Sequence, residues 1–251
     1  MTVSSGPTGF VAPRLIGHRG AAALAPENTL ASIRAAAESG ASWIEIDAKL
    51  ARDGVPVLMH DATLERTTTS IGPVAALSSA ELGRLDAGSK FHPRFTGEPI
   101  PTLAQCLAEC RSLGLGLDLE IKPDKGTEEA TAAGVLAVLD KEGWTAADPI
   151  LITSFRTKAL RVIRDYAPTF QRGLLIWEFP EGWQDAARDL GAVTVISDQK
   201  SLKAESDVAR IVDGGWVAMT YTVNERPRAA ELYGWGIDGI VTDDPPALRG
   251  L

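Results

Sequence analysis

The chain has 251 residues, of which 45% are hydrophobic, so it can bury a sizeable core and is not an intrinsically disordered protein. Its formal net charge of −8 argues against a nucleic-acid-binding surface, which would need clustered lysine and arginine. The longest apolar runs fall short of the roughly 20 residues that cross a bilayer, so we expect no integral membrane segment.

The N-terminal segment 1–14 shows no basic cluster followed by an apolar stretch, which predicts no secretory signal and a cytoplasmic location. The two cysteines, Cys106 and Cys110, are four residues apart in a predicted helix, a spacing that does not favour a disulfide. We interpret both as small core residues, because no histidine or further cysteine lies near them for a metal site.

Short β-rich runs alternate with amphipathic stretches along nearly the whole chain, as is typical of a parallel sheet built from βα units. The predicted strands are 15–18, 43–50, 55–60, 115–121, 150–154, 173–177, 193–196, 217–222 and 239–242. The predicted helices are 29–39, 103–112, 128–141, 158–166, 182–190, 205–212 and 226–233. In the first helix, Asn28 is expected to be the N-cap and Gly40 the end, with Leu30, Ile33 and Ala37 facing the core.

The run 55–60 follows its predecessor through Asp53-Gly54, which predicts a two-residue hairpin turn and an antiparallel strand. The other eight strands match a (β/α)8 TIM barrel, for which about 250 residues is the ordinary size. We predict a single catalytic domain over 1–251 with an insertion at about 61–101. We interpret this long polar connection as a small cap over the barrel mouth, since long loops in compact domains are usually functional.

Titratable residues gather where three predicted strands end, which is the catalytic face of such barrels. His18 and Arg19 follow the first strand, and Glu45 and Asp47 share one face of the second. Glu120 and Lys122 share one face of the strand at 115–121. Buried carboxylates without a cation are unfavourable, so these positions predict a divalent metal held by Glu45, Asp47 and Glu120. A network of salt bridges to Lys122 and Arg19 is the alternative.

The predicted hairpin adds a second histidine to this site. A two-residue turn at Asp53-Gly54 would pair Asp47 with His60 and place their Cβ atoms about 5 Å apart. His18 and His60 could then act as general acid and general base, or could bind the metal. With three carboxylates available, we assign a hard cation, Mg²⁺ or Ca²⁺, to the carboxylates and proton transfer to the histidines.

Two basic residues suit a phosphate: Arg19, with glycines at positions 17 and 20, and Lys122. Both could instead only neutralise the carboxylates. The third histidine, His92, lies in the insertion and is interpreted as a surface or packing residue.

These residues stand in motifs that resemble the glycerophosphodiester phosphodiesterase family over almost the whole chain. The motifs are Gly17-His18-Arg19-Gly20, Pro26-Glu27-Asn28-Thr29, Glu45-Ile46-Asp47, His60-Asp61, Arg66-Thr67-Thr68, Glu120-Ile121-Lys122, Thr222-Val223-Asn224 and Gly239-Ile240-Val241-Thr242-Asp243. The resemblance implies metal-dependent hydrolysis of glycerophosphodiesters to glycerol 3-phosphate and an alcohol, through a cyclic phosphate. It implies metal ligation by Glu45, Asp47 and Glu120, acid–base catalysis by His18 and His60, and phosphate contacts from Arg19 and Lys122.

Tyr221 stands where family members often have tryptophan, and it either lines the substrate site or only packs. Within the same chemistry, the alternative is a lysophospholipase D or a phospholipase C acting on a lipid. From other classes, a non-catalytic glycerophosphodiester-binding protein or a metal-assisted sugar isomerase are the alternatives. The expected partner is a small-molecule substrate, and the sequence indicates neither the preferred alcohol nor an oligomeric state.

Overall fold

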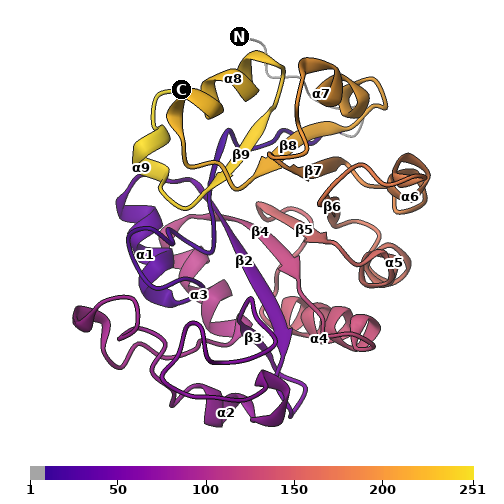
Figure 1. The fold of residues 1–251 in the computed structure, drawn as a ribbon. Coiled ribbons are helices and arrows are strands. Elements are labelled where there is room, and N and C mark those ends of the chain that lie inside the picture. Colours follow the sequence, from indigo (N-terminus) through magenta and orange to yellow (C-terminus); the bar gives the residue numbers. More distant parts are fainter. Residues whose placement is uncertain (1–8) are drawn as a thin grey trace.

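The protein is a closed (β/α)8 barrel in a computed structural model that describes residues 9–251 (Figure 1). The eight parallel strands are β1 (Leu15–Gly17), β2 (Trp43–Leu50), β4 (Gly116–Ile121), β5 (Ile150–Ser154), β6 (Gln171–Ile176), β7 (Thr194–Asp198), β8 (Val217–Tyr221) and β9 (Gly239–Thr242). β1 closes the barrel, because it pairs in parallel with β9 on one side and with β2 on the other. The predicted fold is confirmed.

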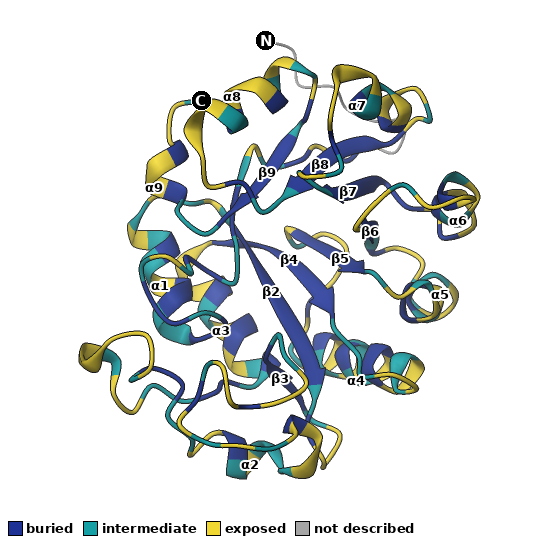
Figure 2. Cartoon of the chain, in the orientation of Figure 1, coloured by how far each residue is buried: buried dark blue, intermediate teal, exposed yellow. Residues whose placement is uncertain are grey.

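Helices cover the outside of the barrel and bury one face each. They are α1 (Leu30–Glu38), α3 (Leu103–Leu113), α4 (Glu128–Lys141), α5 (Thr157–Tyr166), α6 (Trp183–Asp189), α7 (Glu205–Val212), α8 (Arg226–Gly234) and the short α9 (Pro245–Leu248). Figure 2 shows the strands almost wholly buried inside this ring, whereas the helices alternate between buried and exposed faces. Within the described part of the chain, no helix is both long and apolar enough to cross a membrane.

Residues 1–8 lie outside the described residues. They belong to the segment 1–14, on which the expectation of no secretory signal is based. From residue 9 onward the chain contributes to the core, where Phe10 and Ala12 pack with barrel residues such as Ile16 and Val241. Alternate strand residues such as Ile44 and Ile46 face the helices, as the period of a strand requires. The inward positions near the strand ends are therefore left for polar side chains.

The hairpin after β2 differs from the prediction by one residue. β3 (Pro56–Leu58) pairs antiparallel with β2, with Ala48 opposite Leu58 and Leu50 opposite Pro56. The loop has three residues, Arg52 to Gly54, with Gly54 at φ 77°, the left-handed conformation that ends a three-residue hairpin loop. Asp47 therefore lies opposite Met59, whose N–H donates to the Asp47 carbonyl at 3.0 Å, and not opposite His60.

The N-cap of α1 was also misassigned. Thr29 is the cap, and its hydroxyl accepts from the Ser32 N–H. Asn28, at φ 55°, instead uses its side chain on Asp47: Nδ2 donates to Oδ2 at 2.8 Å, and Oδ1 accepts from the Asp47 N–H at 3.1 Å. The predicted end of the helix is confirmed, since Gly40 has φ 81° just after it.

Both cysteines are buried in α3 as free thiols with their Sγ atoms 3.9 Å apart, which confirms their interpretation as core residues. His92 is exposed, and its Nδ1 accepts from the Arg94 N–H.

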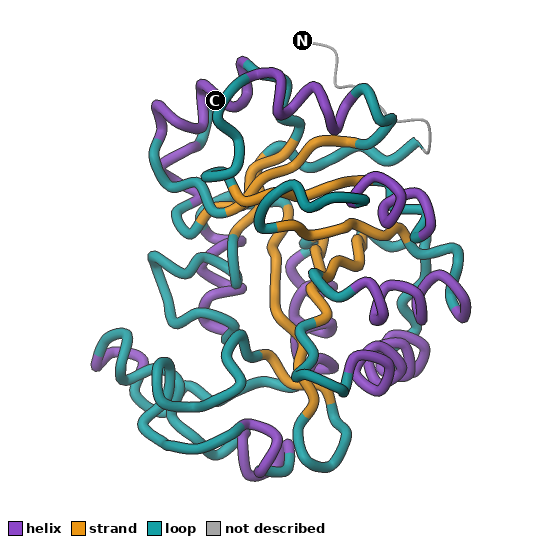
Figure 3. Tube along the Cα trace, turned by 45° about the vertical axis from the view of Figure 1, so that its right-hand side comes forward, coloured by secondary structure: helices purple, strands orange, loops and turns teal. Residues whose placement is uncertain are grey.

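The segment between β3 and α3 forms short helical turns around a small core of its own. These turns are η1 (Val74–Ala76), α2 (Ser79–Leu82) and η2 (Pro93–Phe95), and the core includes Leu64, Val74 and Leu82. Figures 1 and 3 show this segment beside α1 and the β2–β3 hairpin, at the side of the barrel. Two hydrogen bonds connect it to the chain around α1: Arg94 donates to Leu24 O, and Glu98 accepts from the Ala31 N–H.

Candidate active site

Acidic residues from two neighbouring strands meet inside the barrel near its C-terminal end. Asp47 of β2 stands opposite Glu120 of β4 in the parallel register, and Glu45 stands opposite Asp118. All four side chains are buried. One carboxylate oxygen from each of Glu45, Asp47 and Glu120 lies within 4.8 Å of the other two, so the strand register alone assembles a three-carboxylate cluster.

Two cations flank this cluster. Lys122 Nζ lies 2.9 Å from Glu120 Oε1 and 3.3 Å from Asp47 Oδ1. Arg19 Nε lies 3.4 Å from Asp47 Oδ2, while its Nη1 donates to Glu27 at 2.6 Å. The salt bridges named as the alternative to a metal are therefore present in part, but Arg19 divides its charge between Asp47 and Glu27.

The protonation of the cluster is uneven. Burial raises the pKa of Glu45 well above its usual range, and the charges of Asp47 and Glu120 raise it further. Burial and the Asp47 charge raise the pKa of Glu120 to about 8. Burial would also raise the pKa of Asp47, but Lys122 and Arg19 outweigh it and hold the pKa below its usual range. Two of the three carboxyl groups thus lack enough positive charge among the described residues to ionise fully at neutral pH.

The donor set fits a hard divalent cation. Its three ligands are carboxylates, which Mg²⁺ and Ca²⁺ prefer. Glu120 Oε1 is buried and, among the described residues, has no aligned hydrogen-bond donor in spite of its ion-pair contact with Lys122. A dication would supply both the missing positive charge and the missing partner.

Each histidine at the site is held by a carboxylate on its Nδ1. His18 Nδ1 lies 2.6 Å from Asp243 Oδ1, because β1 and β9 are paired and place Gly17 opposite Thr242. His60 Nδ1 lies 2.6 Å from Asp61 Oδ1. An ionised carboxylate accepts the Nδ1 proton, so in each neutral ring Nε2 is left as the proton acceptor. His18 Nε2 lies 3.9 Å from Glu45 Oε2, toward the carboxylate cluster.

The pKa values of these pairs follow their surroundings. Burial opposes ionisation of Asp61, but hydrogen bonds from Arg66 and His60 lower its pKa to about 2. Burial likewise opposes ionisation of Asp243, but the hydrogen bond from His18 outweighs it and lowers the pKa of this carboxyl. Burial lowers the pKa of His60 itself. Both carboxylates are therefore ionised and able to orient their histidines.

The turn after β1 depends on glycine. A side chain at Gly17 would collide with the Gly20 carbonyl, and one at Gly20, where φ is 89°, would collide with Ser32. Between them Arg19 adopts φ 50°, and its backbone N–H donates to Glu45 Oε2 at 3.0 Å. This tight turn directs His18 and Arg19 together toward the carboxylates.

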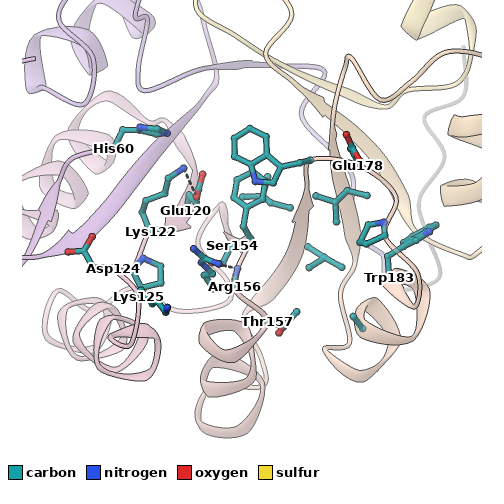
Figure 4. Close-up of a pocket in the computed structure, with 18 of the residues that line it drawn as sticks. His60, Glu120, Lys122, Asp124, Lys125, Ser154, Arg156, Thr157, Glu178 and Trp183 are labelled. Atoms are coloured by element: carbon teal, nitrogen blue, oxygen red, sulfur yellow. Dashed lines mark hydrogen bonds and ion pairs between the residues drawn. The ribbon is translucent and has the colours of Figure 1, made fainter. Parts of the chain in front are cut away.

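Two adjoining cavities open at the site. The smaller, about 220 Å³, is lined by residues that include His18, Arg19, Glu45 and Tyr221. The larger, about 690 Å³, extends over the ends of β4, β5 and β6 and shares His60, Glu120, Lys122, Phe155 and Trp177 with the first. In Figure 4, His60, Glu120 and Lys122 lie on one side of the larger cavity and Glu178 on the other.

An aromatic wall stands where the two cavities meet. Phe155 stacks on Trp177 with ring centroids 4.6 Å apart, and both rings meet Tyr221 edge to face. Trp177 is 60% exposed, which is unusual for a residue of this size. Tyr221 lines the smaller cavity, and its hydroxyl donates to Ile176 O at 2.9 Å, so this residue both lines the site and packs.

The structure brings together every site residue predicted from the sequence, but several supporting residues were missed. Asn28, Asp61 and Asp243 hold Asp47, His60 and His18, and Glu27 and Arg66 extend this network. Asp61 directly follows His60, and Asp243 directly follows a predicted strand, so both carried a positional signal. Glu27 and Arg66 carried none beyond their place in the family motifs.

The fold and site define a (β/α)8-barrel enzyme whose candidate metal centre shares a cavity with two carboxylate-held histidines. The sequence matches the glycerophosphoryl diester phosphodiesterase family over residues 18–247, and the chain belongs to this family. The enzyme class expected from the sequence is thereby confirmed.

The relatives agree over nearly their whole lengths. A glycerophosphodiester phosphodiesterase of Caldanaerobacter subterraneus subsp. tengcongensis is 32% identical, covering 94% of this chain and 96% of the relative. A putative glycerophosphodiester phosphodiesterase of Bacillus subtilis is 31% identical, covering 92% and 94%. The solved structure of an Oleispira antarctica phosphodiesterase, in complex with the product sn-glycerol-3-phosphate, has a TM-score of 0.91 and 36% identity, covering 96% of this chain and 97% of that one.

Proposed function

We propose that this enzyme hydrolyses glycerophosphodiesters to glycerol 3-phosphate and an alcohol, with a divalent cation and with His18 and His60 as the acid–base pair. The observation that carries the proposal is the three-carboxylate cluster at a cavity that is also lined by two histidines whose Nδ1 atoms are both held by carboxylates. The product named in the Oleispira complex supports the substrate class.

Glu45, Asp47 and Glu120 would hold the cation, either Mg²⁺ or Ca²⁺. When bound, it would polarise the phosphoryl oxygens and neutralise charge that builds up on them. Arg19 and Lys122 would bind the remaining phosphate oxygens, since both line the smaller cavity with their cationic groups near the cluster. The two side chains also keep Asp47 ionised, which its role as a ligand requires.

The histidines would move the protons in two steps. In the first, the 2-hydroxyl oxygen of the glycerol attacks phosphorus, the bond from phosphorus to the alcohol oxygen breaks, and a cyclic phosphate forms. One histidine takes the hydroxyl proton on Nε2, and the other gives an Nε2 proton to the departing alcohol. In the second step water opens the cyclic phosphate with these roles reversed, so both histidines return to their starting states.

The larger cavity supports a division of these roles. We infer that it receives the departing alcohol, because it shares lining residues with the smaller cavity and is bounded by His60 but not by His18. His60 is then the proton donor in the first step and His18 the acceptor. Burial lowers the pKa of His60 in the free enzyme, but an anionic phosphodiester beside the ring would favour its protonated form.

The assay that tests this function measures glycerol 3-phosphate release from glycerophosphocholine, glycerophosphoethanolamine and glycerophosphoinositol. Activity is expected with Mg²⁺ or Ca²⁺ and should be lost with a chelator and recovered when the cation is returned. No release from any of the three substrates in the presence of either cation would reject the proposal.

The aromatic wall gives a more specific expectation. Trp177→Ala removes the exposed indole face and with it a cation–π contact to the choline group. The kcat/KM for glycerophosphocholine should therefore fall roughly tenfold, and the kcat/KM for a substrate with a neutral alcohol should fall less. Tyr166→Ala is the matched control, since this aromatic side chain is also exposed but lies at the end of α5, away from both cavities. Equal losses on both substrates would contradict placement of the alcohol against Trp177.

A lysophospholipid is the second candidate substrate. The larger cavity continues past Trp177 to apolar residues of β6 and α6, including Leu174, Ile176, Trp183 and Ala186. These could accommodate part of an acyl chain, and in that case the acylated glycerol, not the departing choline, would occupy the larger cavity. Choline release from lysophosphatidylcholine, compared with release from glycerophosphocholine at equal concentration, distinguishes the two substrates.

A further inference from the structure

Arg66 lies outside both cavities, yet its guanidinium joins two carboxylates that support the site. Its Nε and Nη2 donate to Asp61 at 2.6 and 3.1 Å. Its Nη1 and Nη2 donate to Glu27 at 2.6 and 2.8 Å. Arg66 is thus bidentate to both carboxylates, an arrangement that uses the planar fork of the guanidinium on two sides.

Each carboxylate holds a different residue of the site. Asp61 accepts the Nδ1 proton of His60, and Glu27 accepts a hydrogen bond from Arg19 Nη1, both at 2.6 Å. The chain of contacts therefore runs from His60 through Asp61, Arg66 and Glu27 to Arg19. His60 would move a proton at the phosphodiester and Arg19 would bind it, so the two groups must face the same phosphorus.

We propose that Arg66 is a positioning residue that fixes His60 and Arg19 relative to each other. This inference rests on the proposed function. It gives the insertion a part in catalysis, because both Asp61 and Arg66 belong to that segment. Displacements of about 1 Å in such groups can cost on the order of a hundredfold in rate, so a side chain that touches no substrate can still control turnover.

The two arms of the network predict two separate kinetic effects. In Arg66→Met, the loss of support for Asp61 should lower kcat on the order of tenfold or more, through His60. The loss of support for Glu27 should raise KM several-fold, through the phosphate contact of Arg19. Arg66→Lys should fold like the wild type and still show part of the kcat loss and part of the KM rise. An ammonium group cannot be bidentate to two carboxylates.

Double variants separate this role from a merely structural one. The kcat loss of Arg66→Met should largely disappear in an Asp61→Asn background, and its KM rise should largely disappear in a Glu27→Gln background. Arg52→Met is the matched control. Arg52 pairs with Glu81 at 2.9 Å and is 56% exposed at the side chain, but Glu81 holds no residue of the site. The kcat and KM of Arg52→Met should match those of the wild type.

These measurements use the full chain with its cation and glycerophosphocholine. Wild-type kcat and KM in Arg66→Met would overturn the inference, as would losses that add in full in both backgrounds. If the wild-type enzyme itself releases no glycerol 3-phosphate, the proposed function fails first. An active wild type with unaffected Arg66 variants rejects only the positioning role.

Discussion

At the scale of single residues, the two histidines differ in position more than in chemistry. Both have Nδ1 bound by a carboxylate, but only His60 borders the larger cavity. A leaving alcohol that needs no proton should therefore separate their roles. Nitrophenolate departs readily as an anion, whereas choline departs as an alkoxide that must be protonated.

We expect His18→Gln and His60→Gln each to lose about 100-fold or more in kcat on glycerophosphocholine while still folding. On a glycerophosphodiester of p-nitrophenol, His60→Gln should regain most of its rate of nitrophenolate release in the first turnover, and His18→Gln should not, although His60→Gln should still open the cyclic phosphate slowly. Pre-steady-state nitrophenolate release and steady-state kinetics on glycerophosphocholine, with circular dichroism as the check on folding, measure this. If His18→Gln instead recovers activity on the p-nitrophenol substrate, the assigned roles are exchanged. Wild-type turnover of glycerophosphocholine by either variant would show that its histidine takes no part in proton transfer.

Asn28 shows how a single residue can be misinterpreted from sequence. An asparagine before an amphipathic stretch is a good N-cap, and the sequence offers Asn28 and Thr29 side by side. The threonine takes the cap, which leaves Asn28 free to make two hydrogen bonds to Asp47. The cost is a left-handed backbone at φ 55°, which asparagine tolerates better than most residues.

Two substitutions at this position separate the side chain from the backbone. Asn28→Gly and Asn28→Ala both remove the hydrogen bonds to Asp47, so each should weaken divalent-cation binding roughly tenfold or more. Only alanine adds strain at positive φ, so its Tm should be the lower of the two. Isothermal titration calorimetry and thermal unfolding measure the two effects. Unchanged cation affinity in Asn28→Gly would show that Asn28 does not support Asp47.

At the scale of elements, the eight parallel strands and their helices could be predicted because each carries its own periodic pattern. The hairpin register could not. Asp53-Gly54 is compatible with a two-residue turn and also with a three-residue loop that ends in a left-handed glycine. The structure has the three-residue loop. His60 still reaches the site because the chain bends at this residue, just after Met59 makes its backbone hydrogen bond to Asp47. The right site residue was thus predicted from the wrong pairing.

The partners of the histidines could not be predicted for a different reason. Asp243 meets His18 only because β9 pairs with β1, the contact that closes the barrel across almost the whole length of the chain. Arg66 meets Glu27 through folding of the insertion, whose polar sequence has no regular period. Contacts of this kind depend on tertiary structure and leave no local pattern.

The hairpin loop can be tested with a pair of glycine substitutions. Gly54→Ala places a side chain at φ 77° with no neighbouring atom within 4 Å, so only backbone strain changes, and unfolding should become easier by about 1 kcal/mol. Gly234→Ala lies at an exposed helical position of α8 with equally open space and should stabilise by about 0.5 to 1 kcal/mol. Urea denaturation of both variants provides the measurement. A stabilising Gly54→Ala would contradict the three-residue loop.

At the scale of the whole molecule, the barrel places several carboxyl groups in one buried layer. Burial raises the pKa of Glu120 to about 8 and that of Asp118 to about 7, and Glu45 shifts in the same direction. In the unfolded chain these groups would ionise near pH 4. Between about pH 4 and pH 8 these three groups therefore hold more protons in the folded protein without a cation than in the unfolded chain. The lowered pKa of His60 opposes this by at most one proton, so the free energy of unfolding should fall as pH rises through this window.

The cation should reverse this dependence, because it binds the ionised carboxylates and competes with their protons. We expect the Tm of the chelated protein to fall between pH 5 and pH 8, and the increase in Tm on adding Mg²⁺ or Ca²⁺ to be larger at pH 8 than at pH 5. In Glu120→Gln, which cannot ionise, both the fall and the increase should be smaller. A chelated protein whose Tm rises across this range, or an equal effect of the cation at both pH values, would show that the buried carboxylates do not hold protons that the cation displaces.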